Sequence, residues 1–480
     1  MITAVRSQAL SFQRDHYDAV VVGAGPNGLA AAITLKRKFK SVLLLEARET
    51  IGGGVRSAEL TLPGFIHDVC SAVHPLAVAS PFFRQLELHR YGLEWIQPEI
   101  PLAHPFENGE ALCLHRSLAA TADVLGPDGK AYKELLAPFV ENQERLLSDI
   151  LKPLPLPENP FLMARFGLNA LRSAKNLSEM KFQGERTRAL FAGLAAHAMI
   201  PLDRTATAAF GILLALLAHA VGWPIVKGGS QGLANALADC FRDSGGEILT
   251  GKTVCSRDDL PKADHYFFDV TPRQLLNIGG LDLSANYRRR LSRFRYGPGV
   301  CKVDWALSGP IPWKAEMCRR SGTVHLGGSF EEIDASIRDA HAGRKCDSPY
   351  VVLTQQSLFD PSRAPGGGHT VWAYCHLPHG SAEDVTERIE NRIEHYAPGF
   401  RELILAKSSL SAAAMERYNP NYVGGDINGG LQDLLQLYTR PVISFSPYRT
   451  SNKSIYICSS STPPGGGVHG LCGYYAARGL

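Results

Sequence analysis

The chain has 480 residues, which is too long for one ordinary hydrophobic core and predicts two domains. Apolar residues make up 45% and charged residues 20% of the chain, a balance that excludes a disordered protein. The formal net charge of +4 is small for this length and gives no basic footprint for a nucleic-acid partner.

Ten cysteines are spread singly along the chain, and no Cys-x-x-Cys occurs. This pattern excludes a zinc ribbon and a thioredoxin-type redox pair, and it suits a reducing compartment where free cysteines act as small apolar residues. His376 and His379 stand in "HLPH" without a carboxylate or cysteine set around them, so no metal site is predicted.

Residues 1–18 contain Arg6 and Arg14, no acid before Asp15, and no apolar run of the kind found in a secretory signal. We interpret this segment as an unstructured leader, and an organelle transit peptide is the alternative. The expected location is therefore cytoplasmic.

The first predicted unit is a strand, a glycine turn and a helix. Residues 19–22 are a β-branched run typical of a buried parallel strand, residues 23–28 contain G-x-G-x-x-G, and an alanine-rich helix is predicted over residues 29–37. A second strand, residues 41–45, ends in Glu46, an acid placed to bind a ribose hydroxyl. The unit predicts dinucleotide binding, because such glycines allow a tight turn, close approach to a pyrophosphate and close helix packing. The turn residues assigned to the cofactor are Gly23, Gly25, Pro26, Asn27 and Gly28.

A second glycine element, "EARETIGGGVRS", follows directly. Its spacing, E-x-x-x-x-x-G-G, resembles the extended nucleotide motif of glutathione-reductase-type FAD-binding domains. No Cys-x-x-x-x-Cys follows, which argues against the disulfide reductases that share this fold. By the resemblance, Glu46, Ala47, Arg48, Gly53, Gly54, Val55 and Arg56 lie near the adenosine and the pyrophosphate. Gly54 stands where many relatives have arginine, so Arg56 is assigned the electrostatic role; solvated surface arginines are the alternative for Arg48 and Arg56.

The middle of the chain contains an uncharged stretch and a second glycine-rich unit. Residues 207–226 reach membrane-spanning length, but a histidine, a glycine and a proline interrupt them, so we predict a buried helix that lines an apolar cavity. Residues 228–254 predict a glycine turn, a helix over 233–242 and a strand over 247–254, without G-x-G-x-x-G or a closing acid. We interpret them as a continuation of the first domain, to which residues 267–272 return as a strand. Similar flavoproteins imply cofactor contacts at Val254 and Thr271.

The tail, "KSIYICSSSTPPGGGVHGLCGYYAARGL", predicts a buried strand over residues 454–458, a loop, and a helix from about Gly467. Glycines let a backbone come closer than a Cβ would allow, and the N–H groups of a helix start would stabilise negative charge on a flavin ring. A plain glycine-rich loop before the last helix is the alternative. The tail residues assigned to the cofactor are Ser459, Ser460, Gly466, Gly467 and Val468.

Nearly the whole chain resembles the phytoene-desaturase-related flavoproteins, and within them the branch that contains pyridine nucleotide-disulfide oxidoreductase domain-containing protein 2. The matching stretches include "VVVGAGPNGLAAA", "LLLEARETIGGG", "LPGFIHDVCSAVHP", "AHAVGWPIVKGGSQGLANAL" and "IYICSSSTPPGGGVHGLCGYYAA". The resemblance implies an α/β fold: a Rossmann-like, glutathione-reductase-type domain that holds non-covalent FAD, with an inserted α+β substrate domain. The FAD domain would comprise residues 1–74, 222–299 and 419–480, and the substrate domain residues 75–221 and 300–418. The tail departs from the family pattern, since two serines replace Gly-Ala and Pro463 replaces a histidine.

Hydride removal by a flavin depends more on placing the substrate carbon than on side-chain acid–base chemistry. Catalytic residues therefore stay unassigned. The candidates are His67, Asp68 and His74 in "FIHDVCSAVHP", His219 and Trp223 beside the apolar cavity, and Asp426 in "GGDINGG" as a residue that orients the flavin or a loop. Capping, turn or core roles are the alternative for each.

We predict an FAD-dependent oxidoreductase that removes hydride from a largely apolar small molecule, by desaturation or oxidation. A flavin amine or amino-acid oxidase is one alternative, and an FAD-stabilised binding or scaffold protein with little catalysis is another. The sequence leaves open whether the electron acceptor is oxygen, a quinone or another compound. It also leaves open the oligomeric state and peripheral membrane contact.

Overall fold

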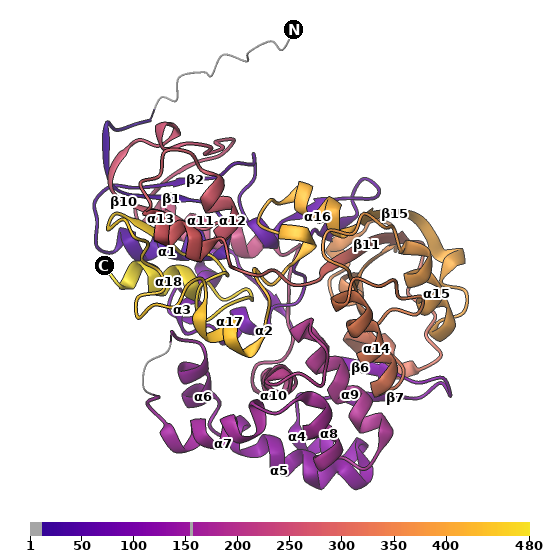
Figure 1. Ribbon diagram of the computed structural model, residues 1–480. Coiled ribbons are helices and arrows are strands. Elements are labelled where there is room, and N and C mark those ends of the chain that lie inside the picture. The colour runs from indigo at the N-terminus through magenta and orange to yellow at the C-terminus, as the bar shows by residue number, and fades with distance from the viewer. Residues whose placement is uncertain (1–11, 154–156) are drawn as a thin grey trace.

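The computed structural model describes residues 12–153 and 157–480, and one end of it is built on a parallel sheet (Figure 1). Five strands pair in parallel in the order β16-β10-β1-β2-β9. Their bounds are β1 His16–Val22, β2 Val42–Leu45, β9 Glu247–Leu249, β10 Lys262–Phe268 and β16 Ile455–Ile457. The beginning, the middle and the end of the chain therefore meet in one sheet.

Helices cover both faces of this sheet, which explains the apolar runs of its central strand. Ala19 and Val21 of β1 belong to the core under α1 (Pro26–Lys36), α11 (Gln231–Asp243) and α18 (Leu471–Arg478). Val20 and Val22 face the opposite core, under α12 (Pro272–Asn277) and α13 (Ala285–Leu291). α18 lies close against α1, because a Cβ on Gly473 would fall 1.8 Å from the Asn27 carbonyl oxygen.

The second sheet has seven strands in the order β15-β11-β14-β13-β12-β6-β7, and all its neighbours are antiparallel except the parallel pair β12 and β6. Their bounds are β6 Ile100–Pro105, β7 Ala111–Leu114, β11 Gly299–Leu307, β12 Ser321–Leu326, β13 Val351–Thr354, β14 His369–Leu377 and β15 Ile404–Leu410. One face packs on α15 (Thr386–Tyr396). The other helices here are α14 (Phe330–His341) and α16 (Ala412–Tyr418), whereas α17 (Leu434–Thr439) lies near α18 and α3 (Figure 1).

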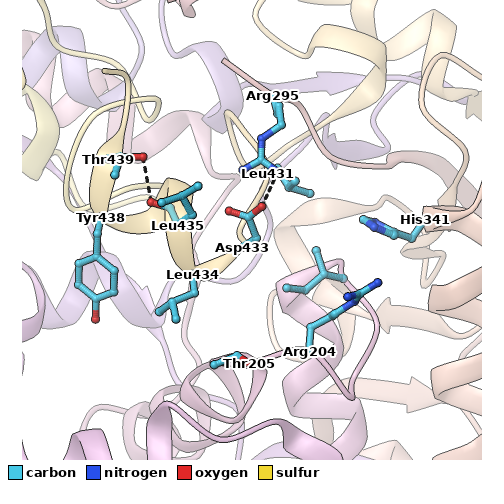
Figure 2. A pocket seen from close by; sticks show the side chains of 11 residues that line it. Arg204, Thr205, Arg295, His341, Leu431, Asp433, Leu434, Leu435, Tyr438 and Thr439 are labelled. Atoms are coloured by element: carbon cyan, nitrogen blue, oxygen red, sulfur yellow. Dashed lines mark hydrogen bonds and ion pairs between the residues drawn. The ribbon is translucent and has the colours of Figure 1, made fainter. Parts of the chain in front are cut away.

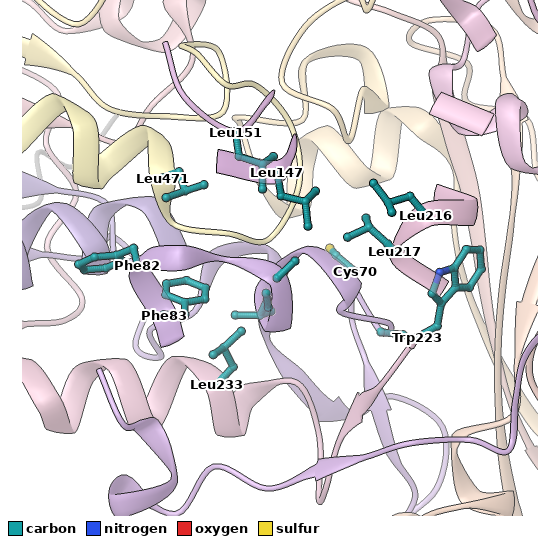
Figure 3. Packing of buried hydrophobic residues seen from close by; sticks show 14 of the residues in the cluster. Cys70, Phe82, Phe83, Leu147, Leu151, Leu216, Leu217, Trp223, Leu233 and Leu471 are labelled. Atoms are coloured by element: carbon teal, nitrogen blue, oxygen red, sulfur yellow. The ribbon is translucent and has the colours of Figure 1, made fainter. Parts of the chain in front are cut away.

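A helical layer lies below both sheets in Figure 1. It consists of α4 (Leu118–Val124), α5 (Gly129–Val140), α6 (Gln143–Ile150), α7 (Pro160–Ala170), α8 (Ala174–Lys181), α9 (Glu185–Ala195) and α10 (Thr207–Ala220). Figure 3 shows Leu216 and Leu217 of α10 near Trp223 and Cys70, in a continuous apolar cluster that extends to Phe82, Phe83 and Leu471. In the part of the chain that the structure describes, no helix has the length and apolar character needed to cross a membrane.

Two short two-stranded sheets, two short helices and ten 3₁₀ helices complete the described elements. β3 (Ser57–Glu59) pairs with β4 (Ile66–Asp68), and β5 (Trp95–Ile96) pairs with β8 (Ile225–Val226). The helices α2 (Pro75–Ala79) and α3 (Pro81–Arg84) follow β4.

Several element bounds differ from the sequence prediction. The predicted strand 267–272 is shifted to Lys262–Phe268, because Thr271 caps α12 and Pro272 begins it. The last helix begins at Leu471, since Gly467 and Gly470 adopt φ of +125° and +69° that keep the preceding segment a loop. The predicted strand over 247–254 ends at Leu249, and the buried helix ends at Ala220. The five-segment domain division stays a prediction, and residues 1–11 of the expected leader lie outside the described residues.

Candidate functional site

A cavity of about 630 Å³ lies between the parallel sheet and the seven-stranded sheet. Segments from the beginning, the middle and the end of the chain line it. The predicted cofactor residues on its wall are Gly23, Gly25, Pro26, Asn27, Glu46, Ala47, Arg48, Gly53, Gly54, Arg56, Val254, Thr271, Ser459, Ser460, Gly467 and Val468. The predicted residues Gly28, Val55 and Gly466 do not line it.

The glycine turn between β1 and α1 leaves no room for side chains. Gly23 has φ of +102°, and a Cβ on Gly28 would fall 1.9 Å from the Gly23 carbonyl oxygen. Gly28 therefore allows helix α1 to start close to the strand end, which is its expected role although it lies off the wall. A Cβ on Gly25 would fall 2.9 Å from Asp269 Oδ2, so the backbone itself forms the wall there.

Glu46, at the end of β2, is buried and held by three donors. Its Oε2 accepts from the Ala24 N–H (2.9 Å), and its Oε1 accepts from the Arg48 N–H (3.0 Å) and from Arg56 Nη2 (2.9 Å). Buried Arg56 therefore pairs with Glu46 rather than standing free for a phosphate. Arg48 is exposed, but it stacks on the ring of Tyr418 at 5.7 Å and thereby joins this end of the cavity to α16.

Asp269, which sequence reasoning missed, lies on the same wall directly after β10. Its Oδ2 accepts from the Gly28 N–H at 2.9 Å, at the start of α1. Burial raises the pKa of Asp269 from 3.8 to about 7, the Gly28 N–H opposes the rise, and the nearby Glu46 adds to it. The signal in the sequence was an acid at the carboxyl end of a buried parallel strand, "YFFD".

These residues fit a dinucleotide. The glycine-formed wall admits a pyrophosphate at the start of α1, and the fixed Glu46 carboxylate suits a ribose hydroxyl. Buried Asn27 Oδ1 and Thr271 Oγ1 have no hydrogen-bond partner within the described chain, which leaves them available to a ligand. Asp269 can be neutral near pH 7, and a neutral carboxyl does not repel phosphate.

The opposite wall of the cavity is a face of the seven-stranded sheet. Val300 and Lys302 of β11, Thr323 of β12, Val352 and Thr354 of β13, and Trp372 and Tyr374 of β14 line it. Lys302 Nζ donates to Asp304 Oδ2, and burial raises the pKa of Asp304 to about 6 although Lys302 opposes the rise. Sequence reasoning missed this wall. The signal for Lys302 and Asp304 was a pair of charges in an otherwise apolar strand, "VCKVDWAL".

Two of the six candidates, His74 and Trp223, line the cavity. The Ser230 hydroxyl donates to the Ser71 carbonyl oxygen, so His74 Nε2 donates to Ser230 Oγ (2.8 Å), which leaves Nδ1 as the accepting nitrogen. Burial lowers the pKa of His74 to about 4. His74 is therefore a neutral imidazole, and its Nδ1 has no partner among the described residues.

The other candidates have structural contacts instead. His67 bonds Thr61 Oγ1 (2.8 Å), and burial lowers its pKa to about 3. Asp68 is paired with buried Arg363 (3.1 Å), and His219 bonds the Tyr132 hydroxyl (2.9 Å). Asp426 accepts from the Gly297 and Gly430 N–H groups and so shapes a turn. Within residues 12–153 and 157–480, no group of three His, Cys, Asp or Glu side chains is placed to hold a metal ion.

A second cavity, of about 700 Å³, is lined by α17 and by residues around Arg204 (Figure 2). At its edge Arg295 Nη1 pairs with Asp433 Oδ2 at 2.6 Å. None of the predicted site residues lines this cavity.

Comparison with known proteins agrees with this geometry. Residues 21–86 match the family model of the NAD(P)-binding Rossmann-like domain. The chain is 27% identical to pyridine nucleotide-disulfide oxidoreductase domain-containing protein 2 of Rattus norvegicus, over 99% of this chain and 95% of the relative. It is 27% identical to phytoene dehydrogenase of Streptomyces griseus over 76% and 73% of the two chains, and 21% identical to one of the subunits of limonene dehydrogenase from Castellaniella defragrans over 96% and 94%.

Solved structures share the fold over nearly the whole chain. An oxidoreductase from Methanosarcina mazei has a TM-score of 0.65 at 15% identity and covers 96% of this chain with 100% of its own. A triple mutant of putrescine oxidase has a TM-score of 0.63 at 16% identity, with coverages of 97% and 98%. The predicted fold class, an α/β dinucleotide-binding architecture with a second sheet-containing part, is confirmed. The chain is thus an oxidoreductase homologous, over most of its length, to the phytoene-desaturase-related enzymes.

Proposed function

We propose that the cavity binds FAD non-covalently and that the enzyme removes hydride from a largely apolar small molecule. The observation that carries this proposal is the shared cavity: one wall has the geometry for a dinucleotide, and the other includes the apolar side chains of Val300, Val352 and Trp372. Two of the relatives are named as dehydrogenases of phytoene and of limonene, which supports an apolar, terpenoid-like substrate. FAD bound there would accept a hydride from a substrate carbon.

Residues of this chain would position the substrate and take up its proton. Desaturation releases a proton as well as a hydride, so a neutral base on the wall is needed. His74 fits this role, because Nδ1 is its accepting nitrogen and lies without a protein partner in the described chain. We expect His74→Gln to lower kcat about a hundredfold with unchanged flavin content and to remove the acidic limb of the pH–rate profile.

The second candidate is a flavin amine oxidase. Trp372 and Tyr374 stand edge to face on the cavity wall, with ring centroids 5.3 Å apart, and supply the aromatic pair that such an enzyme needs. Cyclohexylamine oxidase from Brevibacterium oxydans shares the fold, with a TM-score of 0.58 at 15% identity.

The first experiment asks which cofactor the purified protein holds. We expect a yellow protein that releases FAD, rather than FMN or NAD, on denaturation, as read by absorbance and mass spectrometry. Photoreduction followed by mixing with oxygen or a soluble quinone identifies the electron acceptor. A folded protein that stays colourless and takes up no FAD contradicts the proposal.

The second experiment compares substrate classes by anaerobic reduction of the bound flavin. Phytoene and limonene test the apolar proposal, and putrescine and cyclohexylamine test the amine alternative. Bleaching by a terpenoid supports the first proposal, and bleaching by an amine replaces it with the second. FAD without bleaching by either class indicates the binding or scaffold protein.

A further inference from the structure

Two segments that are far apart in the sequence, residues 284–295 and 440–453, contain no acidic residue. Residues 284–295, which include α13, contain five arginines and no Asp or Glu, and residues 440–453 contain Arg449 and Lys453 on their exposed part and again no acid. Arg289, Arg293 and Arg295 are exposed. In the described chain only Arg295 of the five pairs with a carboxylate, that of Asp433.

Large apolar side chains project into solvent beside these arginines. Ile443 and Phe445 lie two residues apart in the loop after α17 and are 72% and 111% exposed. Leu435 and Tyr438, three residues apart on α17, are 67% and 52% exposed. Exposed apolar groups gathered in this way mark a surface that meets another apolar phase.

Direct contacts hold the two segments together. The Arg290 guanidinium donates to the Ile443 carbonyl oxygen, and Val442 packs in the same apolar cluster as Tyr287 and Leu291 of α13. The Arg295–Asp433 pair ties the end of the arginine segment to the residue that caps α17 (Figure 2). We call this unit, residues 284–295 with 433–453, the arginine–phenylalanine surface; its one acidic residue, Asp433, is paired with Arg295.

We propose that the arginine–phenylalanine surface docks the enzyme on an anionic lipid bilayer. Arginines without carboxylate partners are attracted to anionic headgroups, and side chains at a loop tip, such as Ile443 and Phe445, can enter the interface between headgroups and acyl chains. Exposed arginines beside protruding apolar groups complement a negatively charged, fluid surface.

Vesicle co-sedimentation of the full-length protein tests the proposal without any need for turnover. The probes are phosphatidylcholine vesicles with and without phosphatidylglycerol. We expect about tenfold tighter binding to the anionic vesicles, and loss of that preference at high salt. Phe445→Ser should weaken binding about tenfold, and the double variant Arg289→Gln with Arg293→Gln should do the same.

Control variants carry comparable changes on β15, an edge strand of the seven-stranded sheet, and directly before it. Leu405→Ser removes an apolar side chain that is 54% exposed, and Arg401→Gln removes an exposed arginine. Both should bind vesicles like the unaltered protein. Equal binding to neutral and anionic vesicles, or an equal loss in the controls, would overturn the proposal. Absence of vesicle binding together with self-association that Phe445→Ser abolishes would identify the surface as a contact between copies of the chain and would also overturn it.

Discussion

Gly28 leaves no space for a methyl group, because a Cβ there would meet the Gly23 carbonyl oxygen at 1.9 Å. Gly28→Ala must push α1 away from the strand end, and that displaces the N–H groups that face the cavity. We expect loss of bound flavin and about 3 kcal/mol less unfolding free energy. Flavin absorbance per protein and urea unfolding measure the two effects.

Gly167, inside α7, is the matched control, since nothing lies within 4 Å of a Cβ built there. Gly167→Ala should keep the flavin and raise the unfolding free energy by about 0.5–1 kcal/mol, as alanine favours a helix interior. Equal flavin content in the two variants would show that the glycine turn does not shape the cofactor site.

Asp269 makes stability depend on pH. Its pKa rises from 3.8 to about 7 on folding, so between these values the unfolded chain has lost a proton that the folded chain keeps. The contribution of Asp269 to the free energy of unfolding is therefore fully present below about pH 4 and is lost as the pH rises to about 7. We expect Asp269→Asn, which retains an acceptor for the Gly28 N–H, to be the more stable form at pH above 7, with a gap that closes on acidification. Urea unfolding of both forms across this range measures the gap; parallel curves would contradict the raised pKa.

At the scale of elements, Arg363 joins parts of the chain that belong to different layers. Its fully buried guanidinium contacts Asp68 Oδ2 of β4 (3.1 Å), Asp360 Oδ2 (3.0 Å) and the Val226 carbonyl oxygen of β8 (2.8 Å). Arg363→Met leaves two buried carboxylates without their cation, so we expect a loss of about 3–5 kcal/mol. Denaturant unfolding measures this loss of unfolding free energy.

Arg388 supplies the comparison, because its pair with Glu383 (2.8 Å) is partly exposed. Arg388→Met should cost less than about 1 kcal/mol. Adding Asp68→Asn to Arg363→Met should restore part of the stability. No recovery would mean that lost packing, and not stranded charge, causes the damage.

At the scale of the whole molecule, a cofactor between the layers should stabilise all of them together. FAD added to flavin-free protein should raise the Tm progressively, by an amount that corresponds to about 2.7 kcal/mol at a hundredfold excess over Kd. Calorimetry at increasing FAD concentration measures the shift. A Tm that is independent of FAD would contradict binding at the cavity.

The features that the sequence predicted well are local. The strand, glycine turn, helix and Glu46 lie within one short stretch, so their spacing alone indicates their arrangement. Local patterns single out Asp269 and Lys302, but no local pattern reports the pairing of distant strands that brings them and Tyr374 to the cavity. His67 and Asp68 are residue types suited to catalysis, but in the fold they make buried contacts with Thr61 and Arg363 instead.

The strand order of the parallel sheet bears on how the protein is made. β16 is synthesised about 190 residues after β10, and β10, which is a neighbour of β1, is synthesised about 240 residues after β1. Until β10 has been synthesised, the apolar edge of β1 lacks this partner. Chaperones must shield nascent chains in this state. A ribosome stalled before β16 would therefore hold a polypeptide with a glycine turn but no completed nucleotide cradle.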